Sequence, residues 1–213
     1  MSSTDYGGAY PGKSWSGGTL FANFTGGTNT ENVWSSGADV NIPSYGDATA
    51  WLGQPSVRRA IHIGNLSIGT EGLDQYHAMI ISGDVMNSSK VYMEGVLQAG
   101  VPVLVYNGAW DGVCGAAVSE PLYAALDWAG AEAFRTTLRK PWKVNPTDTE
   151  VAGFASEIKL ASSSSSSSGG SSSSAGGRFA RVVVRRAGHI LPADQPAAAF
   201  DMIDRFVSGR GWP

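Results

Sequence analysis

The sequence predicts an α/β fold, in which a mostly parallel sheet is flanked by helices. The run 101–106 is short, rich in β-branched residues and without polar alternation, as is typical of a parallel strand buried on both faces. A second apolar run, 179–184, indicates another buried strand. Stretches with helical spacing of apolar residues precede and follow the first run, and this alternation of helices and strands defines the class.

The first 46 residues differ in composition from the rest. They are rich in Gly, Ser, Thr and Asn and show no sustained period apart from a possible short strand at 19–24, so we expect them to be irregular and partly disordered. An α/β domain is expected over 47–213, with Asp47 capping its first helix. Further helices are predicted at 56–61 after Pro55, at 73–82, and from Ser88 or Ser89 to Gly100 with Val91, Met93, Val96 and Leu97 facing inward.

The second half of the chain continues the pattern. A helix is predicted at 116–128, with Val118, Leu122, Tyr123 and Leu126 on its buried face, and short strands are predicted at 143–144 and 151–160. The tract 161–177 is almost entirely Ser and Gly and is expected to be a disordered loop. We favour an expanded hairpin over a domain linker, because the residues after the tract are too few to form a core alone.

Charge and composition exclude several classes of function. Charged residues make up 15% of the chain and the net charge is −3, so nucleic acid is not an expected partner. The apolar runs are too short to span a membrane, and no signal peptide is visible. A single cysteine, Cys114, allows no disulfide within the chain, and no residues have metal-ligand spacing. We therefore expect no metal and no cofactor; the oligomeric state is left open.

Two strand ends carry residues that suit acid–base chemistry. Asp111 follows the strand at 101–106, and His189 follows the strand at 179–184 on a loop that Gly188 opens. Asp before His is the chain order of the second and third members of the α/β-hydrolase triad. In such a triad the carboxylate orients the imidazole, which deprotonates a serine. Strand-end residues of these types are more often structural, so the pair alone is a weak signal.

The amino-acid sequence around Asp111 and His189 strengthens the hypothesis of a hydrolase triad. Blocks in the same order along the chain resemble the serine carboxypeptidase family over about 47–207: VLVYNGAWDGVC at 103–114, AGHILPADQPAAA at 187–199, WLGQPSVRRAIH at 51–62 and SGDVM at 82–86. The resemblance implies the C-terminal part of an α/β-hydrolase fold whose N-terminal half is missing. It also implies release of C-terminal residues from peptides and proteins, by an enzyme that is secreted or located in a vacuole or lysosome.

Roles for individual residues follow from the same resemblance. Asp111 would be the triad acid and His189 the general base. Cys114 matches a family cysteine near the catalytic histidine, and Ile190 stands where the family usually has Met; both are candidates for contact with the substrate. Trp110, beside Asp111, is a candidate for lining the substrate pocket.

The sequence also departs from the family pattern. A nucleophile elbow requires Gly-x-Ser-x-Gly, and this motif is absent; the nearest stretch, Gly12–Gly17, lacks the second glycine and has no strand before it. The glycine-rich segment that helps to form the oxyanion hole is also absent. The position of the nucleophile is thus unknown, and we expect the 213-residue chain alone to be inactive.

Three functions remain open at this point. The chain is part of a serine carboxypeptidase, or a non-catalytic relative that binds peptides or a partner, or a carboxypeptidase-like acyltransferase with the same triad. Acceptor patterns for N-glycosylation at Asn23, Asn65 and Asn87 agree with a secretory location, although such triplets arise readily in a Ser/Thr-rich chain.

Overall fold

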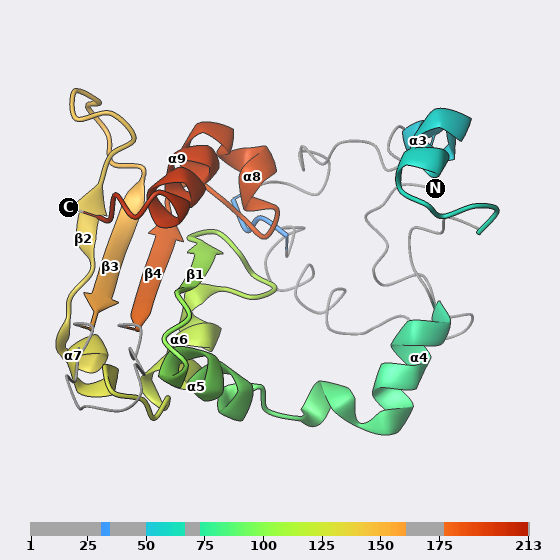
Figure 1. Cartoon of the computed structure of the whole chain (residues 1–213). Helices are drawn as coiled ribbons and strands as arrows, with labels where there is room; N and C mark the ends of the chain where they lie inside the picture. The colour runs from blue at the N-terminus through green and yellow to red at the C-terminus, as the bar shows by residue number, and fades with distance from the viewer. Residues whose placement is uncertain (1–30, 35–49, 67–72, 161–176, 213) are drawn as a thin grey trace, which may run out of the picture. The chain divides into compact units, whose positions relative to one another are not determined.

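The structure is a computed structural model that describes residues 31–34, 50–66, 73–160 and 177–212 (Figure 1). The chain divides into two compact units, which we describe separately. Unit 1 combines Met1–Asn41 with Lys90–Pro213, and unit 2 is Ile42–Ser89. The strand predicted at 19–24 and the cap predicted at Asp47 lie outside the described residues, as does the domain boundary expected at 46–47.

Unit 1 is built on a four-stranded sheet with the order β1-β4-β3-β2. β4 is parallel to β1 and antiparallel to β3, and β2 is antiparallel to β3. The predicted α/β class is confirmed, but the described sheet is mixed rather than mostly parallel, because hairpin connections reverse the chain direction around β3. The strands are β1 Val103–Gly108, β2 Lys140–Trp142, β3 Gly153–Lys159 and β4 Arg178–Val184.

The Ser/Gly tract joins two neighbouring antiparallel strands. Lys159 at the end of β3 pairs with Arg178 at the start of β4, and the Leu160 amide donates to the Gly177 carbonyl at 2.8 Å. This pairing confirms the prediction of an expanded hairpin over that of a domain linker. Residues 161–176 themselves lie outside the described part of the chain.

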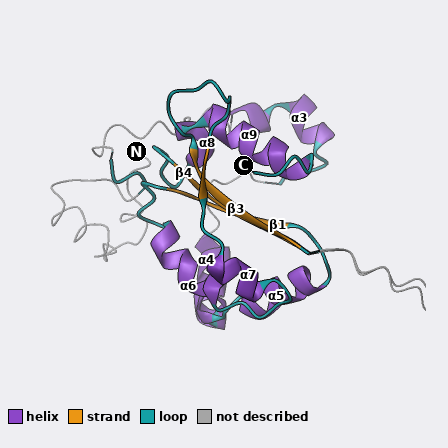
Figure 2. Ribbon diagram, turned by 90° about the vertical axis from the view of Figure 1, so that its left-hand side faces the viewer, coloured by secondary structure: helices purple, strands orange, loops and turns teal. Residues whose placement is uncertain are grey.

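Helices cover both faces of the sheet in unit 1 (Figure 2). α8 (Leu191–Asp194) and α9 (Pro196–Val207) lie on one face. On the other face lie α5 (Lys90–Gln98), α6 (Ala116–Ala124) and α7 (Ala131–Thr136). Because alternate residues of a strand point to opposite faces, β4 contributes side chains to both layers.

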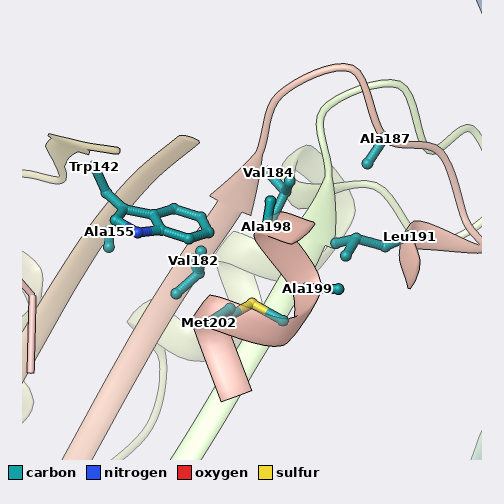
Figure 3. Packing of buried hydrophobic residues seen from close by; sticks show 9 residues of the cluster. All are labelled: Trp142, Ala155, Val182, Val184, Ala187, Leu191, Ala198, Ala199 and Met202. Atoms are coloured by element: carbon teal, nitrogen blue, oxygen red, sulfur yellow. The ribbon is translucent and has the colours of Figure 1, made fainter. Parts of the chain in front are cut away.

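The core under α9 contains small and large side chains that fit together (Figure 3). Ala198, Ala199 and Met202 of α9 pack over Val182 and Val184 of β4. The Trp142 ring from β2 is fully buried beside them, and its Nε1 donates to Asp201 at 2.8 Å. Small residues on α9 let the helix lie close to the sheet, and burial of this apolar surface is the main source of stability for this layer.

The opposite face of the sheet has an aromatic core centred on Phe179 of β4. Phe134 of α7 stacks on this ring at 4.6 Å, and Trp128 and Tyr123 meet it edge-on at about 6 Å. Leu97 from α5 and Leu126 from the loop after α6 complete the cluster. The two cores hold β4 from both sides, so the strand that leads to His189 is the best packed strand of the sheet.

Several predicted elements differ in extent or orientation. The first strand begins at Val103 rather than at residue 101, and it is only partly buried, because β1 lies at the edge of the described sheet. The short strand predicted at 143–144 lies instead at Lys140–Trp142. The helix predicted at 116–128 ends at Ala124, and the chain then turns so that Leu126 and Trp128 enter the core.

The buried faces of two helices were partly misassigned. In α5, Leu97 is buried and Met93 packs against the core, but Val91 and Val96 are exposed. In α6, Val118 is exposed, whereas Tyr123 packs against Phe179. The physical reason is that short helices present only a narrow stripe to the sheet, and the remaining apolar side chains of these helices lie outside that stripe.

Unit 2 contains short helices close to the predicted positions. α3 covers Pro55–Ala60 with Pro55 in the first turn, α4 covers Leu73–Ser82, and a 3-10 turn, η1, covers Asp84–Met86. Residues 50–53 are also helical. Across both units, the helices of the described residues are too short or too polar to cross a bilayer.

Candidate active site

The carboxyl ends of β1 and β4 bring Asp111 and His189 together. These strands are parallel neighbours, so the loops that follow them leave the sheet at the same edge. The Nδ1 atom of His189 lies 3.2 Å from Oδ2 of Asp111, within hydrogen-bonding distance. The Asp111 side chain is 5% exposed and that of His189 is 34% exposed, so the imidazole is accessible while the carboxylate is shielded.

The Asp111 carboxylate is oriented by its own loop. Its Oδ1 accepts the main-chain N–H groups of Val113 and Cys114, each at 2.8 Å, which leaves Oδ2 for His189. Asn107 closes the loop by donating to the Cys114 carbonyl at 2.6 Å. Gly115 is required here, because a Cβ atom at this position would lie 2.4 Å from the Asp111 carbonyl oxygen.

The two loops are in direct main-chain contact. The Ala109 amide donates to the Val184 carbonyl and the Trp110 amide donates to the Ala187 carbonyl, both at 2.8 Å. Below this contact lies Gly108, the last residue of β1, where a Cβ atom would be 2.2 Å from the carbonyl oxygens of Ala187 and Gly188. Any side chain at position 108 would therefore push the loops apart, and with them Asp111 and His189.

The loop of His189 is held by residues from outside it. The Gly188 amide donates to Oδ2 of Asp194 in α8 at 2.6 Å, and the His189 amide donates to the Glu31 carbonyl at 2.6 Å. Arg186, at the start of the loop, has a left-handed backbone with φ of +56° and pairs with Glu150 at 2.9 Å. The imidazole thus projects from a main chain that is fixed on both sides of residue 189.

Residues 31–34 form a part of the site that we did not predict. Asn32 is 6% exposed and donates from Nδ2 to Asp194 at 3.0 Å, and the Val33 amide donates to the Trp110 carbonyl at 2.9 Å. The Trp34 ring stacks on that of Trp110, with centroids 5.2 Å apart. These residues lie in a Gly/Ser/Thr-rich stretch without periodicity, and only Asn32, a turn-forming residue, gave any local signal.

The three predicted substrate-contacting residues lie near the pair but differ in exposure. Trp110 is partly buried beneath Trp34, and Ile190 is partly buried at the N-cap of α8. Cys114 carries a free, exposed thiol, and the contacts described above come from its main chain. Their roles toward a substrate stay predictions.

The arrangement is suited to proton transfer. A carboxylate that accepts a hydrogen bond from Nδ1–H holds the imidazole in one tautomer, so that Nε2 carries the lone pair that takes up a proton. The same carboxylate stabilises the imidazolium that forms. Within residues 31–34, 50–66, 73–160 and 177–212, no group of three or more His, Cys, Asp or Glu side chains could hold a metal ion.

Comparison with solved structures shows the class of fold. The chain is similar to the crystal structure of KEX1(delta)P, a prohormone-processing carboxypeptidase from Saccharomyces cerevisiae, with a TM-score of 0.57. The similarity covers 85% of this chain and 36% of that one, at 18% sequence identity. At this identity the comparison shows the fold alone, which is that of an α/β-hydrolase.

Sequence comparison narrows the class to one family. The model of the serine carboxypeptidase family matches residues 22–209, and the chain belongs to this family. The probable serine carboxypeptidase CPVL of Mus musculus is 35% identical over 196 residues, which cover 92% of this chain and 36% of the relative. The venom serine carboxypeptidase of Apis mellifera is 31% identical over 91% of this chain and 36% of its own length. The chain thus spans about a third of the length of these relatives.

Proposed function

We propose that this chain contributes the acid–base pair of a serine-type carboxypeptidase, which hydrolyses the C-terminal peptide bond of peptides and proteins. The observation that carries the proposal is the contact between His189 Nδ1 and Asp111 Oδ2 at the carboxyl ends of two parallel strands. Membership of the serine carboxypeptidase family supports the reaction class.

In this mechanism His189 acts first as a base and then as an acid. Nε2 takes the proton of a serine hydroxyl as the serine oxygen attacks the scissile carbonyl, and it then gives that proton to the leaving amine. Water is activated in the same way to release the acyl group from serine. The part of Asp111 is to hold the Nδ1–H tautomer and to stabilise the imidazolium.

The serine itself is the missing component of the proposal. No Gly-x-Ser-x-Gly stretch occurs in the 213 residues, so no strand-to-helix elbow for the nucleophile can be assigned. Loss of the serine costs a triad enzyme a factor on the order of 10⁶ in rate. We therefore propose that the 213-residue chain is inactive on its own, and that activity requires a serine presented to Nε2 of His189.

Substrate contacts and location follow from the family and belong to the same proposal. The substrate would be contacted by residues close to the pair in sequence: Trp110 and Cys114 near Asp111, and Ile190 after His189. A secreted, vacuolar or lysosomal location agrees with N-glycosylation, for which Asn65 and Asn87 are exposed acceptors in unit 2, while Asn23 lies outside the described residues.

A second candidate function is a non-catalytic protein that binds peptides or a partner through the same edge of the sheet. The observation that favours it is the missing elbow in a chain that otherwise keeps the Asp–His pair. An acyltransferase with the same triad is the remaining alternative. It would transfer the acyl group to an alcohol instead of to water, so acyl donors and acceptors separate it from a peptidase.

The test uses an organophosphorus probe and a blocked dipeptide substrate. The 213-residue chain is expected to give neither covalent labelling nor release of the C-terminal residue. Co-expressed with the serine-bearing N-terminal part of a family member, it is expected to give both. His189→Ala should then abolish activity, and Asp111→Asn should lower kcat by about 10⁴-fold. Labelling of the chain alone that is lost in His189→Ala would contradict the proposed inactivity, and full activity of both variants would contradict the proposed roles.

A further inference from the structure

A buried asparagine connects residues 31–34 to the loop of His189. Asn32 is 6% exposed although its neighbours in sequence are mostly polar. Both ends of its amide are used, because Nδ2 donates to Asp194 Oδ2 at 3.0 Å and Oδ1 accepts the Trp34 amide at 3.1 Å. A buried amide with both ends bonded has one preferred orientation. Figure 1 shows the short blue segment 31–34 beside α8.

Asp194 links this asparagine to the main chain before His189. The same oxygen, Oδ2, accepts Asn32 Nδ2 and the Gly188 amide, the latter at 2.6 Å. The next amide along the chain, that of His189, donates to the carbonyl of Glu31, the residue before Asn32. Two successive amides are thus fixed by Asp194 and by the neighbour of Asn32.

Residues Glu31 and Asn32 fill the space next to Gly188. A Cβ atom at Gly188 would lie 2.2 Å from the Glu31 carbonyl oxygen and 2.7 Å from Cβ of Asn32. The main chain of 188–189 therefore cannot shift toward segment 31–34 without a clash, and it cannot move away without losing two hydrogen bonds. The direction in which the imidazole leaves the main chain is set by this arrangement.

We propose that Asn32 and Asp194 are positioning residues, which orient the His189 imidazole toward Asp111 through the main chain of residues 188 and 189. The catalytic meaning of this inference rests on the proposed function. Neither residue touches the imidazole, so their effect passes through the hydrogen bonds of the loop. The feature that they control is the tautomer of His189, because only a correctly placed Nδ1–H meets Asp111 Oδ2.

The first variant is Asn32→Asp in the full 213-residue chain. It keeps the side-chain shape and the oxygen that accepts the Trp34 amide, but it removes the donor and places a carboxylate against Asp194. The matched control is Asn145→Asp. Asn145 Nδ2 also donates to an aspartate, Asp148, at 3.3 Å, on an exposed turn after β2, at the opposite edge of the sheet from β1.

The readout is the tautomer of His189 in a long-range ¹H–¹⁵N spectrum of protein labelled at histidine. The chain has three histidines, and His189→Ala identifies the signals of interest. In the neutral ring, the ¹⁵N chemical shifts of Nδ1 and Nε2 report the ratio of the two tautomers. We expect the Nδ1–H form to predominate in the wild-type chain. Its ratio to the Nε2–H form should fall about ten-fold in Asn32→Asp and stay unchanged in Asn145→Asp, as the weakening of one charge-assisted hydrogen bond would produce.

A purely structural role for Asn32 would lower the melting temperature and leave the tautomer ratio as in the wild type, and this result would overturn the inference. Should Asn32→Asp not fold, Asn32→Ala is the milder variant, because it removes the donor to Asp194 without adding a charge. An unchanged tautomer ratio in folded Asn32→Ala would overturn the inference equally. The readout requires no turnover, so a tautomer shift without peptidase activity in the co-expressed complex would remove the proposed function and keep the positioning role.

Discussion

The two loops that meet at the candidate site are held in different ways. The Asp111 carboxylate is fixed by the amides of Val113 and Cys114, two and three residues further along the chain. The loop of His189 is fixed by Asp194 and by residues 31–34, and the Asn32–Asp194 bond joins residues 162 positions apart. Asp111 is therefore oriented by local structure, and His189 is oriented by the assembled unit.

This difference indicates which half of the site can form early. A turn closed by a carboxylate and neighbouring amides needs only its own residues, since the loop-closure cost is small. The orientation of His189 needs β4, α8 and residues 31–34 in place together. A disturbance far from the site is thus expected to affect His189 before it affects Asp111.

The largest effect is expected where the two loops touch. In Gly108→Ala, the new Cβ atom would lie 2.2 Å from two carbonyl oxygens of the His189 loop, so the loops must separate. We expect a loss of about 3 kcal/mol in the free energy of unfolding, measured by urea denaturation. The matched control is Gly95→Ala inside α5, where no atom beyond the adjoining helix backbone lies within 4 Å of the new Cβ; it should stabilise by up to about 1 kcal/mol. An unchanged midpoint for Gly108→Ala would contradict the contact between the loops.

The next effect tests the distant anchor of His189. Asp194→Ala removes the acceptor of both the Gly188 amide and Asn32 Nδ2. Because hydrogen bonds to a charged group are stronger than neutral ones, we expect a loss of about 2 kcal/mol in the free energy of unfolding. The measurement is again urea denaturation. A loss smaller than that of Asp111→Ala would reverse the comparison between the two loops.

The local anchor should be less costly to remove. Asp111→Ala frees the amides of Val113 and Cys114, both in exposed residues, where water can replace the carboxylate. We expect a loss of about 1 kcal/mol, similar to the removal of a helix N-cap. Thermal unfolding followed by circular dichroism measures it, with the half-buried Asp148→Ala as a control for a comparable turn.

The smallest effect is the pH dependence of stability that Asp201 of α9 contributes. Burial alone would raise the pKa of Asp201 in α9, but hydrogen bonds from Arg205 and Trp142, with the charges of Arg205 and Arg210, lower it on balance. A lowered pKa stabilises the fold above the unfolded-state value of about 3.9, and this contribution is lost as the pH falls through the folded value. The stability difference between the wild type and Asp201→Asn should be constant near pH 7 and should shrink below about pH 4. A constant difference down to pH 2 would contradict this linkage.

Much of the fold was predictable because its signals are local. The β-branched run before Asp111, the apolar run before His189 and the helix at 73–82 are all visible in short windows of sequence. The β3–β4 hairpin followed from the shortage of residues after the Ser/Gly tract. The mixed direction of the sheet did not follow, because the pairing partners of β2 and β3 are decided by tertiary contacts.

In the candidate site, too, features with local sequence signals could be predicted and those set by tertiary contacts could not. The contact between Asp111 and His189 could be predicted because each residue follows a recognisable strand and lies in a recognisable sequence block. Asn32 was missed because its contact is with Asp194, and a contact over this sequence distance leaves no periodic pattern. Val91, Val96 and Val118 were placed inward because apolar spacing alone does not show how narrow the contact between a short helix and a sheet is.

The position of the Ser/Gly tract has a consequence for protein engineering. It enters β4 at Arg178, whereas His189 follows the other end of this seven-residue strand, about 20 Å away along its axis at roughly 3.3 Å per residue. Each doubling of the length of such a connection costs only about 0.6 kcal/mol in closure entropy. The β3–β4 connection is therefore a natural insertion point for an affinity tag or a fluorescent reporter, at the end of the sheet that is remote from the imidazole.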